Sequence, residues 1–202
     1  GVASICVKPS MVSRAAELLA DSSVKVSTVI GFPHGGTSTA AKAAEAEQAC
    51  QDGAVELDMV VNIGRSLAGD YAYVEEDIRQ VVAVAAKYKA IVKVIFETGL
   101  LENESQKIEL CGCSERAGAE FVKTSTGFGF VKSAEGTLQS TGATRDDIRL
   151  MRKHFSRGVK ASGGIRSLAD ARAFIDLGAS RLGTSSTEAL VLEEQGSGSS
   201  QE

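Results

Sequence analysis

A short motif recurs three times along this chain and constrains its fold more than any other feature. In each copy a Gly-Ala pair follows a stretch of helical periodicity and leads into an apolar run. The copies are Gly53-Ala54-Val55-Glu56-Leu57, Gly118-Ala119-Glu120-Phe121-Val122 and Gly178-Ala179-Ser180-Arg181-Leu182. Because glycine often follows the last turn of a helix, each copy predicts a helix end and then a strand. The copies are 65 and 60 residues apart, and each interval holds one further strand and helix, which indicates a repeating βα unit.

Apolar runs and helical periodicity divide the chain into seven such units. We expect strands near residues 2–7, 25–31, 55–61, 91–97, 120–126, 158–162 and 180–184. We expect helices near residues 9–20, 38–52, 71–88, 103–117, 144–155, 167–177 and 185–194. This alternation favours an α/β fold with a parallel sheet, either open or closed.

A closed β/α (TIM-type) barrel has eight strands, whereas this sequence begins directly with its first predicted strand. The pattern therefore predicts a β/α barrel that lacks its first βα unit, with that unit located upstream of Gly1. In that case the strands at 2–7 and 180–184 should not pair with each other, because the slot between them is empty.

Two segments show neither the periodicity of a helix nor that of a strand. Residues 129–143 form a connection longer than the roughly two to six residues of most βα loops, which favours a lid, a disordered insertion or both. Residues 195–202 have the composition of a flexible tail. We therefore predict one barrel domain over residues 1–194, containing an inserted loop at 129–143 and followed by the tail.

Composition excludes several classes of function. The 202 residues carry 22 basic against 26 acidic side chains, so there is no basic surplus for binding nucleic acid or an anionic membrane surface. The apolar runs fall far short of the ~18 residues of a spanning helix, and no signal peptide is evident. We expect a soluble, cytoplasmic protein. Four sparse cysteines and two isolated histidines favour reduced thiols and no metal site.

Charged residues interrupt four of the predicted strands, although strands covered on both faces are usually almost entirely apolar. The interrupting residues are Asp58, Lys93, Lys123 and Lys160. Side chains alternate between the two faces of a strand, so Glu56, Asp58 and Asn62 should point inward, opposite to the helices. The same parity turns the three lysines inward. The sequence thus predicts that these charges converge on one cavity.

This convergence admits two interpretations. A purely structural ion-pair network would compensate the cost of several kcal/mol, roughly, that each buried charge carries. Alternatively, a lysine crowded by other cations and partly removed from water has a lowered pKa, so its neutral amine can attack a carbonyl carbon and form a Schiff base. We favour the second interpretation, which makes a lysine the expected nucleophile.

Two loops rich in small residues follow the last two predicted strands. They are Gly163-Gly164-Ile165-Arg166-Ser167 and Gly183-Thr184-Ser185-Ser186. In β/α barrels the loops after the seventh and eighth strands often bind phosphate, because uncovered backbone N–H groups there point at the anion. A Gly-Gly pair alone is equally typical of a tight turn. Two such loops at consecutive strand ends favour a phosphate site.

At these residues the chain resembles the deoxyribose-phosphate aldolase family, which are class I aldolases with a β/α barrel fold. The resemblance extends to about residue 190 and is carried by Cys6-Val7-Lys8-Pro9, Thr28-Val29-Ile30-Gly31-Phe32-Pro33, Glu56-Leu57-Asp58-Met59-Val60-Val61-Asn62, Lys93-Val94-Ile95-Phe96-Glu97-Thr98, Phe121-Val122-Lys123-Thr124-Ser125-Thr126-Gly127-Phe128, Lys160-Ala161-Ser162-Gly163-Gly164-Ile165-Arg166 and Gly183-Thr184-Ser185-Ser186. By resemblance, the Schiff-base lysine falls on Lys123, the second active-site lysine on Lys160 and the proton-relay aspartate on Asp58. The phosphate-binding positions fall on Thr126, Gly127, Gly163, Gly164, Ser185 and Ser186, and Lys93 is assigned to substrate binding.

The resemblance implies reversible retro-aldol cleavage of 2-deoxy-D-ribose 5-phosphate to D-glyceraldehyde 3-phosphate and acetaldehyde through a lysine Schiff base. It implies a phosphosugar as the binding partner, no metal or organic cofactor, and leaves a homodimer and a homotetramer open.

The chain departs from the family in three places. An Asp-His-Thr-type motif in the family's first strand and helix has no counterpart, the loop after Phe128 is longer, and the C-terminal tyrosine of some members is absent. These departures keep open a catalytically inactive barrel that serves as a protein-interaction module. The phosphate loops alone would also fit a phosphosugar isomerase, although such an enzyme has no use for Lys123 beside Lys160.

Overall fold

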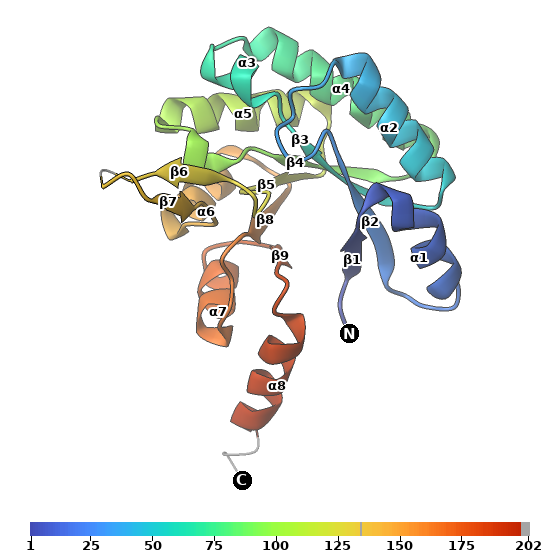
Figure 1. The fold of residues 1–202 in the computed structure, drawn as a ribbon, viewed down its shortest axis with the longest axis vertical. Helices are drawn as coiled ribbons and strands as arrows, with labels where there is room; N and C mark the ends of the chain where they lie inside the picture. The colour runs from blue at the N-terminus through green and yellow to red at the C-terminus, as the bar shows by residue number, and fades with distance from the viewer. Residues whose placement is uncertain (134, 199–202) are drawn as a thin grey trace.

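A computed structural model describes residues 1–133 and 135–198 of the chain (Figure 1). Its strands are β1 (Ser4–Val7), β2 (Lys25–Ile30), β3 (Glu56–Val60), β4 (Ile91–Ile95), β5 (Phe121–Lys123), β6 (Phe130–Lys132), β7 (Leu138–Ser140), β8 (Gly158–Ser162) and β9 (Arg181–Gly183). Its helices are α1 (Val12–Leu18), α2 (Thr39–Gln51), α3 (Ile63–Leu67), α4 (Tyr71–Lys87), α5 (Glu104–Ala117), α6 (Arg145–His154), α7 (Leu168–Asp176) and α8 (Thr187–Gly198), with short 3-10 turns η1 (Pro9–Met11) and η2 (Thr98–Leu100).

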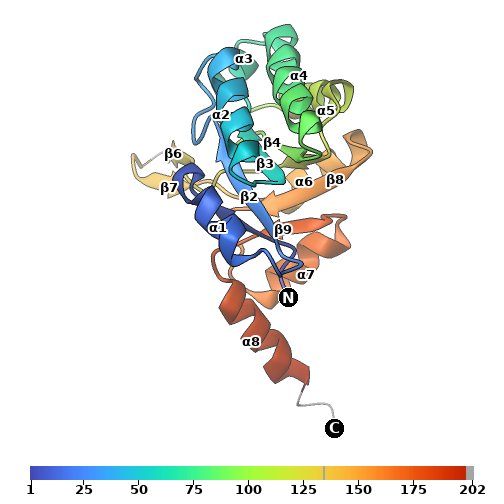
Figure 2. The same cartoon turned by 90° about the vertical axis from the view of Figure 1, so that its right-hand side faces the viewer.

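Seven parallel strands form one curved sheet in the order β1-β2-β3-β4-β5-β8-β9. Helices cover the outer face of this sheet (Figures 1 and 2). The sheet curls far enough that Arg181 in β9 donates hydrogen bonds to Ser4 in β1, at 3.1 Å, and to Glu56 in β3. Within the described residues, no strand ladder joins β1 to β9. The fold is therefore a β/α barrel that is open between the two strands expected to form its edges.

The repeated glycines end helices as the sequence predicts. Gly53, Gly118 and Gly178 have φ values of +106°, +86° and +101°, which residues with a side chain rarely adopt. They follow α2, α5 and α7. At each glycine the chain leaves the helix and turns back, and the apolar run that follows forms β3, β5 or β9.

Two predicted segments differ from expectation. Residues 129–143 contain an antiparallel hairpin in which β6 pairs with β7, rather than an unstructured insertion. Its three-residue strands are mostly exposed and are held by backbone pairing, so they leave little hydrophobic periodicity. Helix α8 continues to Gly198, four residues into the expected tail, and residues 199–202 lie outside the described residues.

The short helix α3 was not expected either. It begins because the Asn62 side chain accepts a hydrogen bond from the Arg65 backbone N–H at 3.1 Å. The Asn62 side chain thus caps α3, and its inward direction beside Asp58 stays a prediction.

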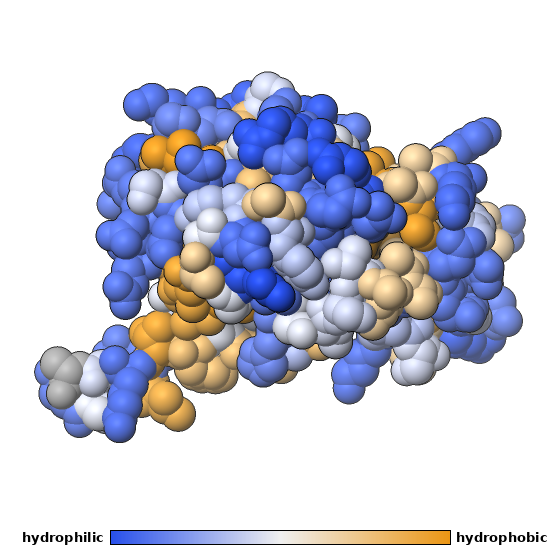
Figure 3. Space-filling view, turned by 90° about the horizontal axis from the view of Figure 1, so that it is seen from above, coloured by the Kyte–Doolittle hydropathy of each residue, from blue (hydrophilic) through white to orange (hydrophobic). Residues whose placement is uncertain are grey.

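The molecular surface over the outer helices is largely hydrophilic (Figure 3). None of the helices in the described ranges is long and apolar enough to cross a membrane. All four cysteines are free thiols, and three of them are buried. Burial, with Glu115 nearby, raises the pKa of the Cys111 thiol to about 12.

A fully buried ion pair joins α2 to α4 on the outer side of the sheet. The Lys42 amine lies 2.5 Å from Asp77 Oδ2 and donates to the Val60 carbonyl at 3.0 Å. The other Asp77 oxygen has no hydrogen-bond partner among the described residues. Both charges are completely removed from water, so each depends on the other.

We predict that Lys42→Met destabilises the protein by about 3 to 5 kcal/mol, because it leaves the Asp77 carboxylate buried without a cation. The double variant Lys42→Met/Asp77→Leu should recover most of this loss. Urea denaturation of both variants measures the effect, with Glu17→Gln in the exposed Arg14–Glu17 pair as control. A double variant as unstable as the single one would contradict this explanation.

Candidate active site

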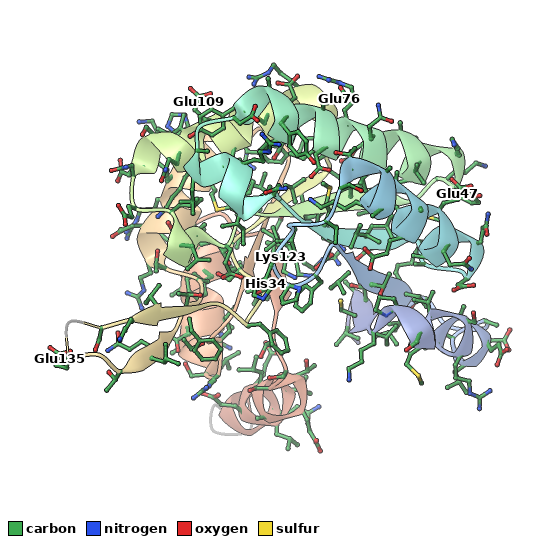
Figure 4. All side chains as sticks on the ribbon, turned by 45° about the horizontal axis from the view of Figure 1, so that its top comes forward. His34, Glu47, Glu76, Glu109, Lys123 and Glu135 are labelled. Atoms are coloured by element: carbon green, nitrogen blue, oxygen red, sulfur yellow. The ribbon has the colours of Figure 1, made fainter. Side chains whose placement is uncertain are left out.

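The inward face of the sheet carries a buried cluster of one aspartate and three lysines. In the strand register, Asp58 of β3 lies opposite Lys93 of β4, and Lys123 of β5 lies opposite Lys160 of β8. All four residues are at most 6% exposed. Figure 4 shows Lys123 near the middle of the curved sheet. The converging charges predicted from strand parity are thus present.

Asp58 is the common partner of the three amines. Its Oδ2 atom accepts hydrogen bonds from Lys123 Nζ at 2.8 Å and Lys160 Nζ at 2.7 Å. Its Oδ1 atom accepts from Lys93 Nζ at 2.7 Å. Because Lys123 and Lys160 share one oxygen atom, their amines lie within a few ångströms of each other, as the sequence predicts.

A second carboxylate extends the cluster toward the open edge of the sheet. Glu56 accepts hydrogen bonds from Arg181 at 3.0 and 3.3 Å and forms an ion pair with Lys93 at 2.8 Å. The sequence reading missed Arg181 as a member of this cluster. Strand parity could have found it, because Arg181 pairs in register with the inward-facing Lys160.

Lys93 is held by two carboxylates, and its role in substrate binding stays a prediction. Its side chain is fully buried, and its amine lies between Asp58 and Glu56. In this position Lys93 neutralises and orients the Asp58 carboxylate.

The cluster shifts the proton affinities of its members. Burial would raise the pKa of Asp58, but the ammonium groups of Lys123, Lys160 and Lys93 outweigh burial and hold this pKa well below its usual range. Burial also lowers the pKa of Lys160 to about 8, helped by Lys123 and Lys93 and opposed by Asp58. The cluster thus contains a lysine with a lowered pKa, and that lysine is Lys160.

The two loops expected to bind phosphate lie side by side, because β8 and β9 are neighbours. Gly163 and Gly164 both have positive φ values, +89° and +78°, a backbone conformation that residues with a side chain rarely adopt. Within the described residues, the N–H groups of Gly163, Gly164 and Ser185 donate no hydrogen bond. These uncovered donors are the feature that an anion site requires.

Two of the other expected phosphate ligands are already engaged. The Ser186 N–H donates to the Thr184 hydroxyl at 2.9 Å, which leaves only the Ser186 side chain available. The backbone N–H and the hydroxyl of Thr126 both donate to Glu97. Thr126 therefore has no donor left for a phosphate in this arrangement, whereas Gly127 beside it is exposed.

A β/α barrel that gathers two inward lysines on one aspartate, next to an uncovered glycine turn, matches a known family. The model of the DeoC/LacD family aldolases matches residues 1–186. The chain belongs to this family. It is 54% identical over 188 residues to the deoxyribose-phosphate aldolase of Carboxydothermus hydrogenoformans, covering 91% of this chain and 77% of that protein. It is 50% identical over 185 residues to the enzyme of the same name from Streptococcus mutans, covering 91% and 78%.

Solved structures of aldolases agree with this one in fold. The aldolase QR15 matches with a TM-score of 0.87 and 36% identity, covering 100% of this chain and 86% of that chain. The tetrameric deoxyribose phosphate aldolase from Aeropyrum pernix matches with a TM-score of 0.82 and 32% identity, covering 94% and 76%. The expected family and barrel fold are therefore confirmed.

We predict that the low pKa of Lys160 depends on its neighbours in opposite directions. Lys123→Met should raise the pKa of Lys160 above about 8, because a repelling ammonium is removed. Asp58→Asn should lower it, because an attracting carboxylate is removed. NMR titration of lysine-labelled protein measures both midpoints, with the exposed Lys87→Met as control. Equal midpoints in all variants would show that burial alone sets the value.

Proposed function

We propose that this aldolase cleaves 2-deoxy-D-ribose 5-phosphate to D-glyceraldehyde 3-phosphate and acetaldehyde, with Lys123 as the Schiff-base nucleophile. The observation that carries the proposal is that the Lys123 and Lys160 amines share one oxygen of Asp58. Two relatives named deoxyribose-phosphate aldolase are 54% and 50% identical to this chain over 91% of its length, and they support the same substrate.

In the proposed reaction, the Lys123 amine, once it has given up its proton, adds to C1 of the open-chain aldehyde, and loss of water leaves an iminium. The C2–C3 bond then breaks, because the three carbons from C3 to C5 form the glyceraldehyde 3-phosphate product. The electron pair of this bond moves into the iminium and produces an enamine. Protonation of the enamine at C2 and hydrolysis of the resulting iminium release acetaldehyde and the free amine.

Bond cleavage requires removal of the proton from the C3 hydroxyl group. Asp58 is a poor acceptor, because its pKa is held well below the usual range. Lys160, with a pKa of about 8, is partly neutral near physiological pH and suits proton transfer. We assign this transfer to Lys160, directly or through one water, while Asp58 orients both amines.

The substrate's 5-phosphate would lie on the turn after β8 and the loop after β9. The free N–H groups of Gly163, Gly164 and Ser185 support this assignment, together with the Ser186 hydroxyl and the exposed Gly127 at the rim. Thr126 would act through its neighbours rather than touch the substrate.

The alternative of an inactive barrel kept for protein interaction is not favoured, because relatives that are 54% and 50% identical to this chain are named deoxyribose-phosphate aldolase. A homo-oligomer, dimer or tetramer, is also part of the proposal. Its support is the tetrameric Aeropyrum pernix relative, and light scattering on the purified protein decides between the two states.

We expect sodium borohydride with acetaldehyde to attach a stable adduct to Lys123, because reduction fixes a Schiff base to its lysine. Lys123→Ala should abolish trapping, whereas the exposed Lys87→Ala should leave it unchanged. Peptide mass mapping locates the adduct. An adduct on Lys160, or one retained in Lys123→Ala, would refute the assignment.

We expect Ser185→Glu to raise KM for deoxyribose 5-phosphate by about tenfold or more, because a carboxylate at an anion site repels the phosphate. Activity on unphosphorylated deoxyribose should change little. The matched control is Ser23→Glu, which places the same charge on an exposed loop at the opposite end of the strands. Equal effects on both substrates would show that Ser185 does not lie at the phosphate site.

A further inference from the structure

Glu97 is a buried carboxylate that the proposed reaction does not use. It lies just after β4 and is 1% exposed. Its backbone has φ +55° and ψ 59°, the left-handed conformation that costs a residue with a side chain about 1 to 2 kcal/mol. Within the described residues no basic side chain forms an ion pair with it, and all its hydrogen bonds come from neutral donors. Such a group persists only where its contacts compensate for its cost.

The Glu97 carboxylate connects the ends of two strands. Its Oε2 atom accepts hydrogen bonds from the Thr126 backbone N–H, at 3.0 Å, and from the Thr126 hydroxyl. The Thr126 hydroxyl in turn accepts the Phe128 N–H at 3.0 Å. Thr126 is only three residues after Lys123, and Gly127 is next to it. Glu97 thus holds the chain that leaves the end of β5 on both its backbone and its side chain.

The same carboxylate also holds the base of the β6–β7 hairpin. Its Oε1 atom accepts the Thr141 hydroxyl at 3.1 Å, and the Thr141 N–H donates to the Gly129 carbonyl at 2.8 Å. A Cβ at Gly129 would lie 2.3 Å from the Thr141 hydroxyl and 2.6 Å from Glu97 Oε1, so a larger residue there would have to displace this contact.

Just after this base, the chain contacts the turn that follows β8 before it enters α6. The Ala143 N–H donates to the Gly163 carbonyl at 3.1 Å, and a Cβ at Gly142 would lie 2.6 Å from the same oxygen. The tip of the hairpin projects away from Lys123, as the position of Glu135 in Figure 4 shows. The hairpin therefore meets the site through its base, where Glu97 lies.

We propose that Glu97 is a positioning residue that aligns the two phosphate-binding loops with Lys123, and that it thereby sets the preference of the enzyme for phosphorylated substrates. The inference rests on the proposed function and adds a determinant of its specificity. Through Thr126, Glu97 fixes the Gly127 turn. Through Thr141, it fixes the segment after β7, whose Ala143 N–H donates to the Gly163 carbonyl.

The chemistry of the donors explains why this position needs a carboxylate. Glu97 receives three hydrogen bonds, and all three come from N–H or O–H groups. A glutamine has one acceptor oxygen, so its amide nitrogen would face either the Thr126 N–H, where that contact is lost, or the Thr141 hydroxyl, which would then have to turn from donor to acceptor. Hydrogen bonds to a charged acceptor are about twice as strong as neutral ones, so the remaining contacts would weaken as well.

The test compares Glu97→Gln with wild type on deoxyribose 5-phosphate and on unphosphorylated deoxyribose. We expect kcat/KM for the phosphorylated sugar to fall about tenfold or more, and kcat/KM for deoxyribose to change less than about twofold. Calorimetric titration with inorganic phosphate should show a similar loss of affinity. Borohydride trapping of acetaldehyde should be unchanged, because Lys123, Lys160 and Asp58 remain in place.

A second pair of variants tests the hairpin contact without altering the charge. Thr141→Val removes the hydroxyl at nearly constant volume and should reproduce part of the Glu97→Gln effect, whereas Thr141→Ser keeps the hydroxyl and should resemble wild type. Thermal denaturation checks that each variant is folded.

Several results would overturn the proposal. One is an equal loss on both sugars, which indicates a general structural role. Others are unchanged phosphate affinity in Glu97→Gln, or tighter phosphate binding, which would mean that the charge of Glu97 merely repels the anion. If wild type itself traps no acetaldehyde, the proposed function fails, and the phosphate titration still decides the role of Glu97.

Discussion

The interior of this barrel depends on the Asp58 carboxylate. Three ammonium groups converge on it from neighbouring strands, and without this anion they would repel one another in a space that water barely reaches. The carboxylate compensates for most of this repulsion but not for all of it, because the cluster as a whole holds more cations than anions. Burial, together with this remaining repulsion from Lys123 and Lys93, lowers the pKa of Lys160 to about 8, which leaves one amine of the cluster able to exchange a proton near neutral pH.

This interaction exists only because the sheet is curved. Asp58, Lys93, Lys123 and Lys160 come from four strands, and in a flat sheet the first and the last of them would be separated by three strand spacings. Curling brings β8 and β9 back toward β3, which lets Lys160 contact Asp58 and lets Arg181 contact Glu56. The ion pairs that cross the interior in turn link strands that have no ladder between them.

Much of the architecture could be predicted because it depends on local rules. Helix ends at Gly53, Gly118 and Gly178 follow from backbone sterics, and the inward direction of Asp58 and the lysines follows from the two-residue period of a strand. The hairpin at 130–140 could not be predicted, because its short exposed strands pair through the backbone. The engagement of Thr126 by Glu97 was also hidden, since it joins residues 29 positions apart at the ends of two strands.

The sequence alone determined which residues alternate between the faces of each strand, where α2, α5 and α7 end, and therefore which charges must share the interior of a parallel barrel. Those properties depend on each residue and its immediate neighbours. Only the tertiary structure decided how the charges are paired. In the folded chain the pKa of Lys160 is lowered, and Lys93 is buried between two carboxylates. The N–H and the hydroxyl of Thr126 both donate to Glu97. Electrostatic energies and hydrogen bonds depend on distances between side chains that are remote in sequence, and these distances are set only when the sheet closes on itself.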